Sequence, residues 1–336
     1  MTGHGAMEVS GAGIGSTVVA APETREPVPA ARDAVLAAHA RFRNLRDGRL
    51  ADFIPALATR DPDLFGIALT LADGTILEAG DTRIPFTLQS LSKVFTLARV
   101  LEESGPEVII EDIGVDATGR VFNSIDAIEQ HHGREMNPLV NAGAIATVGH
   151  VSGTTREEIW QRILDIHSAF AARALDVDEA VYASESATNQ RNRAIGILMH
   201  AYERFPIDPL LATDLYTRQC AIAVTTQDLA TMAATLAFGG RNPVTGAQVM
   251  PRALVPGLLA VMATSGLYDE SGKWLFQTGC PAKSGVSGGL FAVVPGRFGV
   301  AAFSPLLDEA GNSVRAWQSI AAIIDALDAN PLARFA

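Results

Sequence analysis

The chain has 336 residues, 48% of them apolar and 19% charged, which is enough to bury the core of one large domain or of two smaller ones. Its formal net charge of −11 argues against nucleic acid or an anionic membrane as a partner, because both attract clustered Lys and Arg. No apolar run approaches the roughly 20 residues that span a bilayer. A small-molecule partner fits this composition better.

Cysteine usage indicates a reducing compartment. Only Cys220 and Cys280 are present, too few for a disulfide framework and without the partners of a zinc site. We therefore expect a cytoplasmic protein, with neither a metal nor an organic cofactor.

The beginning of the chain predicts a tail followed by two helices. Residues 1–30 are rich in Gly, Ala, Pro and Thr without periodicity, which is typical of a disordered segment. Apolar residues then recur at helical spacing in 34–45 and again in 53–58. Two short opening helices are expected there.

Two strand pairs are predicted, one near each end of the ordered chain. Each consists of two β-prone runs joined by a turn dipeptide, which is the pattern of a hairpin. They are residues 65–71 and 75–79 around Asp73-Gly74, and residues 289–294 and 298–303 around Pro295-Gly296.

The region between these hairpins is predicted to be mostly helical. Capping boxes mark two helix starts, one at Thr155 with Glu158 and one at Thr225 with Asp228. A final helix is expected at 313–327.

Strands near both ends with helices between them predict an α+β fold. We expect one domain over 31–336, with an antiparallel sheet, flanking helices and an inserted all-helical lobe. The sheet lobe would comprise about 31–105 and 275–336, and the helical lobe about 106–274.

The segment 85–93 carries the first candidate chemistry. It leads from a strand into a helix that Gly105 ends, with Ser90 near the helix N-terminus and Lys93 one turn along on the same face. A neutral lysine can take the proton of a serine nucleophile, and the helix N-terminus stabilises the negative charge that develops. Ser92 is a competing hydroxyl, and an ordinary helix cap followed by a solvated lysine is the alternative interpretation.

A second segment supports the catalytic interpretation. Lys283-Ser284-Gly285 has the form of the K-T-G element that accompanies S-x-x-K in penicillin-recognising enzymes. A second cation close to Lys93 would lower the pKa of Lys93 toward the neutral form that a base requires. The two motifs together indicate a broad class of serine and lysine acyl transfer.

Further segments narrow the class. From about residue 50 to 313 the chain resembles the serine-dependent glutaminase family, whose fold is related to that of β-lactamases. The matching segments are 51–55, Gly80-Asp81, Leu88-Gln89-Ser90, 137–145, Glu185, Arg191-Asn192, 194–196, Val224-Thr225, 232–237, 266–269 and 281–286.

The resemblance assigns roles to individual residues. Ser90 would be the nucleophile, Lys93 the base, and Tyr268 the tyrosine that lies against them. The backbone amides of Ser90 and Val286 would form the oxyanion hole. The side chains expected to hold substrate are Gln89, Asn141, Glu185, Asn192, Tyr216 and Tyr268, with Lys283 and Phe53 as auxiliary residues.

This set implies hydrolysis of L-glutamine to L-glutamate and ammonia. A carboxylate such as Glu185 suits the α-ammonium of glutamine, and neutral donors suit its α-carboxylate. The resemblance also implies a homodimer or homotetramer. Two alternatives stay open: another Ser/Lys amide hydrolase of the β-lactamase-like class, and a glutamine-binding or scaffolding protein with impaired catalysis.

Phe53 departs from the family pattern. The family usually has a tyrosine at this position, and its hydroxyl is placed in the active site. We expect its absence to reduce turnover unless water or Tyr268 takes over its role.

Overall fold

The computed structural model describes residues 27–134 and 136–333. The predicted tail lies mostly outside this range, except that residues 28–30 already belong to the first helix. The thirteen labelled α-helices of the described part are α1 Val28–Phe42, α2 Ser92–Ser104, α3 Pro106–Val108, α4 Ile125–Gln130, α5 Asn141–Gly149, α6 Arg156–Ala171, α7 Glu179–Thr188, α8 Gln190–Ala201, α9 Pro209–Cys220, α10 Thr226–Ala237, α11 Val255–Ser265, α12 Ser271–Thr278 and α13 Val314–Ala326.

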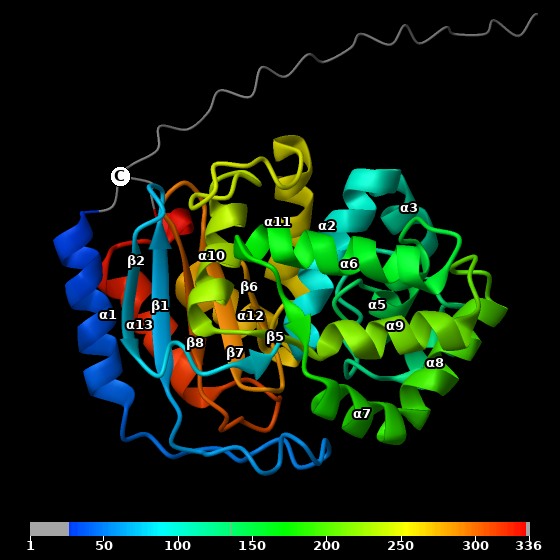
Figure 1. Cartoon of the computed structure of the whole chain (residues 1–336), viewed down its shortest axis with the longest axis horizontal. Coiled ribbons are helices and arrows are strands. Elements are labelled where there is room, and N and C mark those ends of the chain that lie inside the picture. The colour runs from blue at the N-terminus through cyan, green and yellow to red at the C-terminus, as the bar shows by residue number, and fades with distance from the viewer. Residues whose placement is uncertain (1–26, 135, 334–336) are drawn as a thin grey trace, which may run out of the picture.

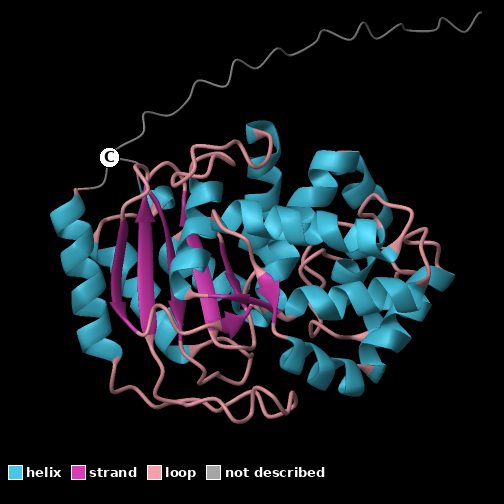
Figure 2. Cartoon of the chain, viewed as in Figure 1, coloured by secondary structure: helices cyan, strands magenta, loops and turns pink. Residues whose placement is uncertain are grey.

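The strands form two sheets. Five of them make an antiparallel sheet in the order β2-β1-β8-β7-β6, and three short ones make a second sheet in the order β3-β5-β4. Their bounds are β1 Gly66–Leu71, β2 Ile76–Gly80, β3 Phe86–Thr87, β4 Asp176–Val177, β5 Ile222–Val224, β6 Ala282–Ser284, β7 Gly289–Val294 and β8 Phe298–Phe303. Figure 2 shows the larger sheet at one side of the molecule and helices alone at the other.

Both predicted hairpins are confirmed, β1 with β2 and β7 with β8. At the first turn the amide of Thr75 donates to the Asp73 carboxylate over 3.0 Å. Gly74 there has a φ of +81°, which a residue without a Cβ adopts at no steric cost. Turn chemistry read from two residues therefore located the hairpin correctly.

Helices cover both faces of the five-stranded sheet (Figure 1). Because successive side chains of a strand point to opposite faces, β8 contributes Val300 to one core and Ala301 to the other. The core with Val300 includes α1 and α13, and the core with Ala301 includes α10 and continues into the helical lobe. This arrangement confirms the predicted α+β fold.

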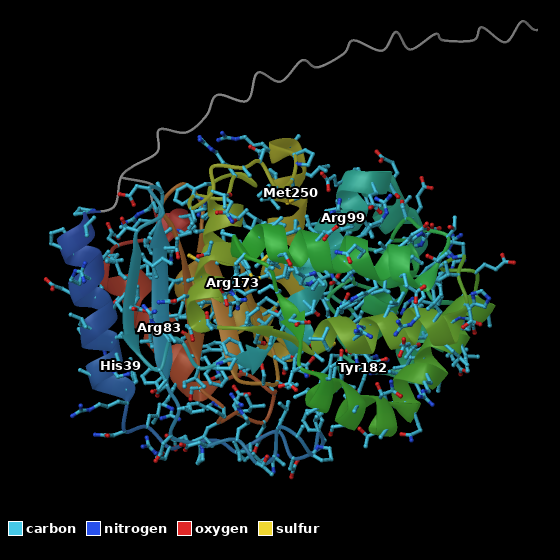
Figure 3. All side chains as sticks on the ribbon, viewed as in Figure 1. His39, Arg83, Arg99, Arg173, Tyr182 and Met250 are labelled. Atoms are coloured by element: carbon cyan, nitrogen blue, oxygen red, sulfur yellow. The ribbon has the colours of Figure 1, made fainter. Side chains whose placement is uncertain are left out.

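The helix α10 joins the two halves of the molecule. It lies in the segment that we assigned to the helical lobe, yet it packs on the sheet. Its predicted capping box at Thr225 and Asp228 is present, as is the one at Thr155 that starts α6. Arg173, labelled in Figure 3, follows α6 and donates to both carboxylate oxygens of Asp228, at 2.8 and 2.6 Å. The end of α6 is thus tied to the start of α10.

The second predicted opening helix is wrong. Residues 52–60 form successive turns instead of a helix. The apolar side chains of this segment, Ile54 and Leu57, pack with Val286 and Leu307 in a small separate core. Pro55 in the middle of the segment cannot donate the hydrogen bond that a continuous helix needs. The first opening helix exists, displaced toward the N-terminus.

None of the helices in the described residues is both long and apolar enough to pass through a bilayer.

Candidate active site

Ser90 lies in a tight turn between β3 and α2. The amide of Leu88 donates to the carbonyl of Ile222 over 2.9 Å, which anchors the chain before the turn, and a short 3-10 helix at Gln89–Leu91 leads into α2. Gln89 has a φ of +51°, a conformation that a residue with a side chain rarely adopts. This strained turn places Ser90 at the start of a helix, facing the cleft between the two lobes.

The competing hydroxyl is excluded by its partner. Ser92 is completely buried, and its Oγ donates to the carbonyl of Gln89 over 2.7 Å. It does not line the cleft, whereas Ser90 does. Of the two hydroxyls in this turn, only Ser90 can reach a substrate.

Lys93 is 1% exposed, so it is not the solvated lysine of the alternative interpretation. Its Nζ donates to the carbonyl of Leu139 at 3.2 Å and to Oδ1 of Asn141 at 2.8 Å. Burial lowers the pKa of Lys93 to about 8, with the charge of Glu185 acting in the opposite direction. About one tenth of Lys93 is therefore neutral at pH 7, far more than of an ordinary lysine, and a general base must be in this form.

Lys283 lies behind the same site. It is on β6 at the edge of the sheet, yet it is completely buried. Its Nζ donates to the carbonyls of Gly266 at 2.9 Å and Ser284 at 2.7 Å. The same atom lies 4.5 Å from the ring centroid of Tyr268.

Burial, and not a second cation, is the cause that lowers the pKa of Lys93. Burial, and after it repulsion from Lys93, also lowers the pKa of Lys283 well below its ordinary value. Both lysines are thus shifted toward the neutral form, and the sequence-based prediction attributes the low pKa of Lys93 to the charge of Lys283 instead of to burial.

Tyr268 follows α11 in the short helix Tyr268–Glu270 and has a φ of +53°. Its hydroxyl is buried and lacks a well-formed hydrogen bond. Burial raises the pKa of Tyr268 to about 12, and the side chains of Ser90 and Ser284 beside the hydroxyl partly offset the effect. Tyr268 is therefore neutral and has a proton available next to Ser90. Like Gln89, it combines a positive φ with a place beside Ser90.

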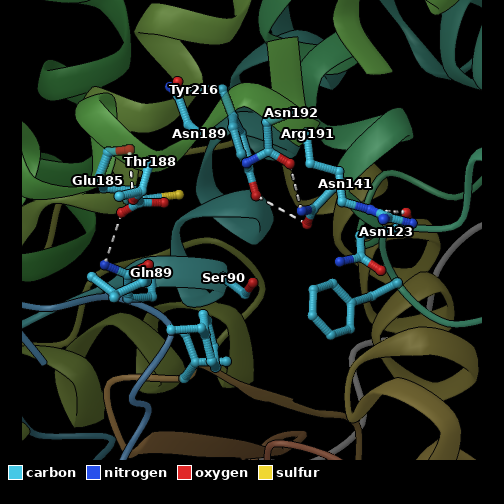
Figure 4. Close-up of a pocket in the computed structure, with 15 residues that line it drawn as sticks. Gln89, Ser90, Asn123, Asn141, Glu185, Thr188, Asn189, Arg191, Asn192 and Tyr216 are labelled. Atoms are coloured by element: carbon cyan, nitrogen blue, oxygen red, sulfur yellow. Dashed lines mark hydrogen bonds between the residues drawn. The ribbon is translucent and has the colours of Figure 1, made fainter. Parts of the chain in front are cut away.

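The predicted substrate residues gather in one cleft of about 320 Å³. Ser90 lies on its floor (Figure 4). The predicted residues that line the cleft are Phe53, Gln89, Ser90, Asn141, Glu185, Asn192, Tyr216 and Val286; the other lining residues are Ile54, Phe122, Asn123, Thr188, Asn189, Arg191 and Cys220. Lys93, Tyr268 and Lys283 lie outside the lining, behind the floor.

One wall of the cleft is a network of neutral groups centred on Asn141. Its Oδ1 accepts from Lys93 and from the hydroxyl of Tyr216, the latter at 3.1 Å. Its Nδ2 donates to Oδ1 of Asn192 over 2.9 Å. Figure 4 shows the contacts of Asn141 with Tyr216 and Asn192. These contacts orient the side-chain amide of Asn141, which connects Lys93 to the wall of the cleft.

The opposite wall carries the only carboxylate among the lining residues, that of Glu185. Gln89 donates to it from Nε2 over 3.2 Å. Burial raises the pKa of Glu185 to about 7, while Gln89 and the charge of Lys93 lower it. Such a group gains most by pairing with a cation that a ligand brings.

A close backbone approach brings Val286 to the cleft. Val286 follows β6 in the turn to β7, next to Gly285. A Cβ on Gly285 would lie 2.7 Å from the carbonyl of Leu88, closer than a side chain tolerates. Glycine therefore lets this turn approach the segment that precedes Ser90.

Three of the seven other lining residues, Phe122, Asn123 and Arg191, make contacts that the sequence interpretation did not include. The carbonyl oxygen of Phe122 accepts a hydrogen bond from the backbone N–H of Asn141 over 2.8 Å. The Nε of Arg191 donates to the carbonyl of Asn123 over 3.0 Å. Arg191 is in one of the segments that match the glutaminase family, and this match could have pointed to it. Phe122 and Asn123 are in no matching segment, and only the folded chain brings them to the site.

An antiparallel sheet flanked by helices, with a serine and a buried lysine on the helix between the lobes, defines a serine amidohydrolase of the β-lactamase-like fold. The sequence profile of the glutaminase family matches residues 48–331. The chain is 49% identical over 293 residues to a glutaminase of Colwellia psychrerythraea, covering 87% of this chain and 94% of that relative. It belongs to the glutaminase family.

Solved structures agree with this assignment. One described as a probable glutaminase, ybaS, superposes with a TM-score of 0.89 at 44% identity, covering 90% of this chain and 98% of that one. Another, of Mglu in its glutamate form, has a TM-score of 0.81 at 37% identity, covering 86% of this chain and 67% of that one. The predicted family, fold and enzyme class are confirmed, and neither alternative function is favoured.

The pKa values predict the pH dependence of activity. Glu185, with a pKa of about 7, must be ionised to pair with a cationic substrate group, and Lys93, with a pKa of about 8, must be neutral to act as base. Both groups are in the active form only after losing a proton, so kcat/KM should rise with pH. We expect a rise of about tenfold per unit between the two pKa values and a steeper one below both.

Steady-state ammonia release across this pH range measures the profile. Protonation of Lys93 should appear mainly in kcat and protonation of Glu185 mainly in KM. A profile that is flat from about pH 6 to pH 9 would contradict both assignments.

Proposed function

We propose that the protein carries out the family reaction, hydrolysis of L-glutamine to L-glutamate and ammonia, through a γ-glutamyl ester on Ser90. The observation that carries the proposal is the dry, neutral-prone Lys93 one turn from Ser90, below a cleft that has one carboxylate on one wall and amides on the other. No cofactor enters the reaction.

The first chemical step forms the ester. Lys93 takes the proton of Ser90 as Oγ attacks the side-chain carbonyl carbon of glutamine. The backbone amides of Ser90 and Val286 stabilise the oxyanion. The proton then passes to the departing nitrogen, directly or through the hydroxyl of Tyr268, and ammonia leaves. Attack of water on the ester, with the proton again taken by Lys93, releases glutamate and restores Ser90.

The walls of the cleft suit the two charged groups of the substrate. Glu185, oriented by Gln89, accepts from the α-ammonium. Asn192, whose Oδ1 accepts from Asn141, keeps its Nδ2 as a neutral donor for the α-carboxylate. The hydroxyl of Tyr216 donates to Asn141 Oδ1 and helps to hold this amide in place. Pairing with the α-ammonium also offsets the desolvation penalty of the buried Glu185 carboxylate, so Glu185 favours binding of a cationic group.

The nucleophile is tested by two neighbouring substitutions. Ser90→Ala should abolish ammonia release from L-glutamine, because no other hydroxyl of the turn reaches the cleft. Ser92→Ala is the matched control, because Ser92 lies two residues further along the chain and outside the cleft. This variant should keep turnover within about tenfold of the unmodified enzyme. If Ser90→Ala is folded, as judged by circular dichroism, and still releases ammonia, Ser90 is not the nucleophile.

Phe53 is tested by restoring the missing hydroxyl. Its ring is 59% exposed and lines the cleft, so a tyrosine fits without repacking. If this hydroxyl positions substrate or shuttles a proton, Phe53→Tyr should raise kcat/KM by about tenfold, the usual effect of one well-placed hydrogen bond. Phe53→Leu is the control and should give no gain. Equal rates for Phe53→Tyr and the unmodified enzyme would show that the absence of the hydroxyl does not limit turnover.

We also propose a cytoplasmic homodimer or homotetramer. The two buried, free cysteines are compatible with a reducing compartment. Large apolar side chains that are more than half exposed, Ile197, Leu210 and Phe276, are available for subunit contacts. Light scattering coupled to gel filtration should give a mass that is two or four times that of the chain, and a monomer at micromolar concentration would contradict the proposal.

A further inference from the structure

A second cavity of about 290 Å³ adjoins the substrate cleft. Phe122 lines both cavities, and its ring centroid lies 5.1 Å from that of Tyr268, which lines only the second. The two rings form the partition between them. The second cavity lies among the end of α11, the start of α12 and the loop that precedes α4, and we call it the rear cavity.

The rear cavity reaches the back of the reacting groups. Leu139 lines it, and the carbonyl of Leu139 is one of the two acceptors of Lys93 Nζ. Tyr268 lines it too, and the hydroxyl of Tyr268 lies beside Ser90. The residues that bind the amino-acid part of glutamine, among them Glu185 and Asn192, line only the front cleft. The rear cavity is therefore on the side of the base and of the tyrosine.

One buried hydroxyl at the rear cavity has no partner. Ser265 lines it, is 8% exposed, and its Oγ makes no hydrogen bond. An unpaired buried hydroxyl costs free energy, so Ser265 favours a small polar molecule that can pair with it. The volume suits several waters, at about 30 Å³ each, or one small amine.

We propose that the rear cavity is the acceptor site of the acyl-enzyme, through which ammonia leaves and a small neutral nucleophile, water or a primary amine, enters. This inference rests on the proposed function, because it needs the ester on Ser90. While the glutamyl group fills the front cleft, the rear cavity gives access to the ester carbonyl from the other side of Tyr268.

With an amine the reaction balances as follows. The amine nitrogen attacks the ester carbonyl, a carbon–nitrogen bond forms and the bond from carbon to Ser90 Oγ breaks. Lys93 takes the proton that the amine loses and returns it to Ser90 Oγ. The product is a γ-glutamyl amide, or a γ-glutamyl hydroxamate when the nucleophile is hydroxylamine. No oxidant or further reactant is required.

The chain offers a matched pair of substitutions to test the cavity. Gly272 and Gly257 are both exposed helical glycines at which an added Cβ would meet no heavy atom within 4 Å. Gly272 lines the rear cavity and Gly257 does not. Gly272→Trp therefore obstructs the cavity, and Gly257→Trp controls for the cost of a tryptophan in a helix. Thr264→Trp, on α11 at the opposite side of the cavity, is a second obstruction if the first fails to fold.

The measurement is the partition of the acyl-enzyme between water and hydroxylamine. Full-length protein is given L-glutamine and a fixed concentration of hydroxylamine, and hydroxamate and glutamate are both quantified. Gly272→Trp should lower the hydroxamate-to-glutamate ratio by about tenfold, the discrimination that a steric change in one pocket commonly achieves. The KM for glutamine should not change, and Gly257→Trp should behave as the unmodified enzyme. With ethylamine, which is larger than hydroxylamine, Gly272→Trp should lower the ratio of γ-glutamyl amide to glutamate even further.

The outcomes separate the two proposals. If the unmodified enzyme releases no ammonia from glutamine, the proposed function fails. If it hydrolyses glutamine and forms hydroxamate while both folded obstruction variants keep the ratio and the amine preference, only the rear cavity is wrong, and nucleophiles enter through the front cleft.

Discussion

The site depends on keeping the Lys93 ammonium out of water without giving it a counterion. Its two hydrogen-bond acceptors are a backbone carbonyl and the amide oxygen of Asn141, both neutral. A carboxylate in either place would stabilise the charged form of Lys93 and remove the neutral amine that its proposed role as base needs. The single acidic group of the cleft, Glu185, is instead hydrogen-bonded to Gln89 and interacts with Lys93 only through its charge. The neutral character of the surroundings of Lys93 is thus a requirement of the chemistry.

The fold meets this requirement by burying α2 inside the core that the sheet shares with the helical lobe. The helix is buried along most of its length and packs against α5, α6 and α11. Two of the six non-glycine residues with positive φ in the described part of the chain, Gln89 and Tyr268, lie beside Ser90. Two rigid lobes hold these turns in place, and each lobe contributes residues to the cleft. Packing in both lobes therefore supports the geometry at their junction.

Local chemistry in the sequence located many elements correctly. The Asp73-Gly74 turn, both capping boxes and the helix after Ser90 follow from a few neighbouring residues, and the site residues followed from the family resemblance. The helix expected at 53–58 failed because helical spacing was read without regard to Pro55 and to the packing of Ile54 against Val286. The state of Lys283 could not be predicted, because its burial depends on segments far away in the chain. The same holds for Phe122, whose carbonyl contact with Asn141 exists only in the folded protein.

The order of strands in the large sheet also governs how the protein is made. Strand β8 lies between β1 and β7, although β1 ends at Leu71 and β8 begins at Phe298. During translation the β1–β2 hairpin leaves the ribosome early, and the apolar edge of β1 has no partner until almost the whole chain has been synthesised. An unpaired edge of this kind invites pairing with other chains, so the nascent protein relies on shielding during this period. Tyr268 and Val286 also emerge late, so the surroundings of Ser90 are completed only after the helical lobe has been synthesised.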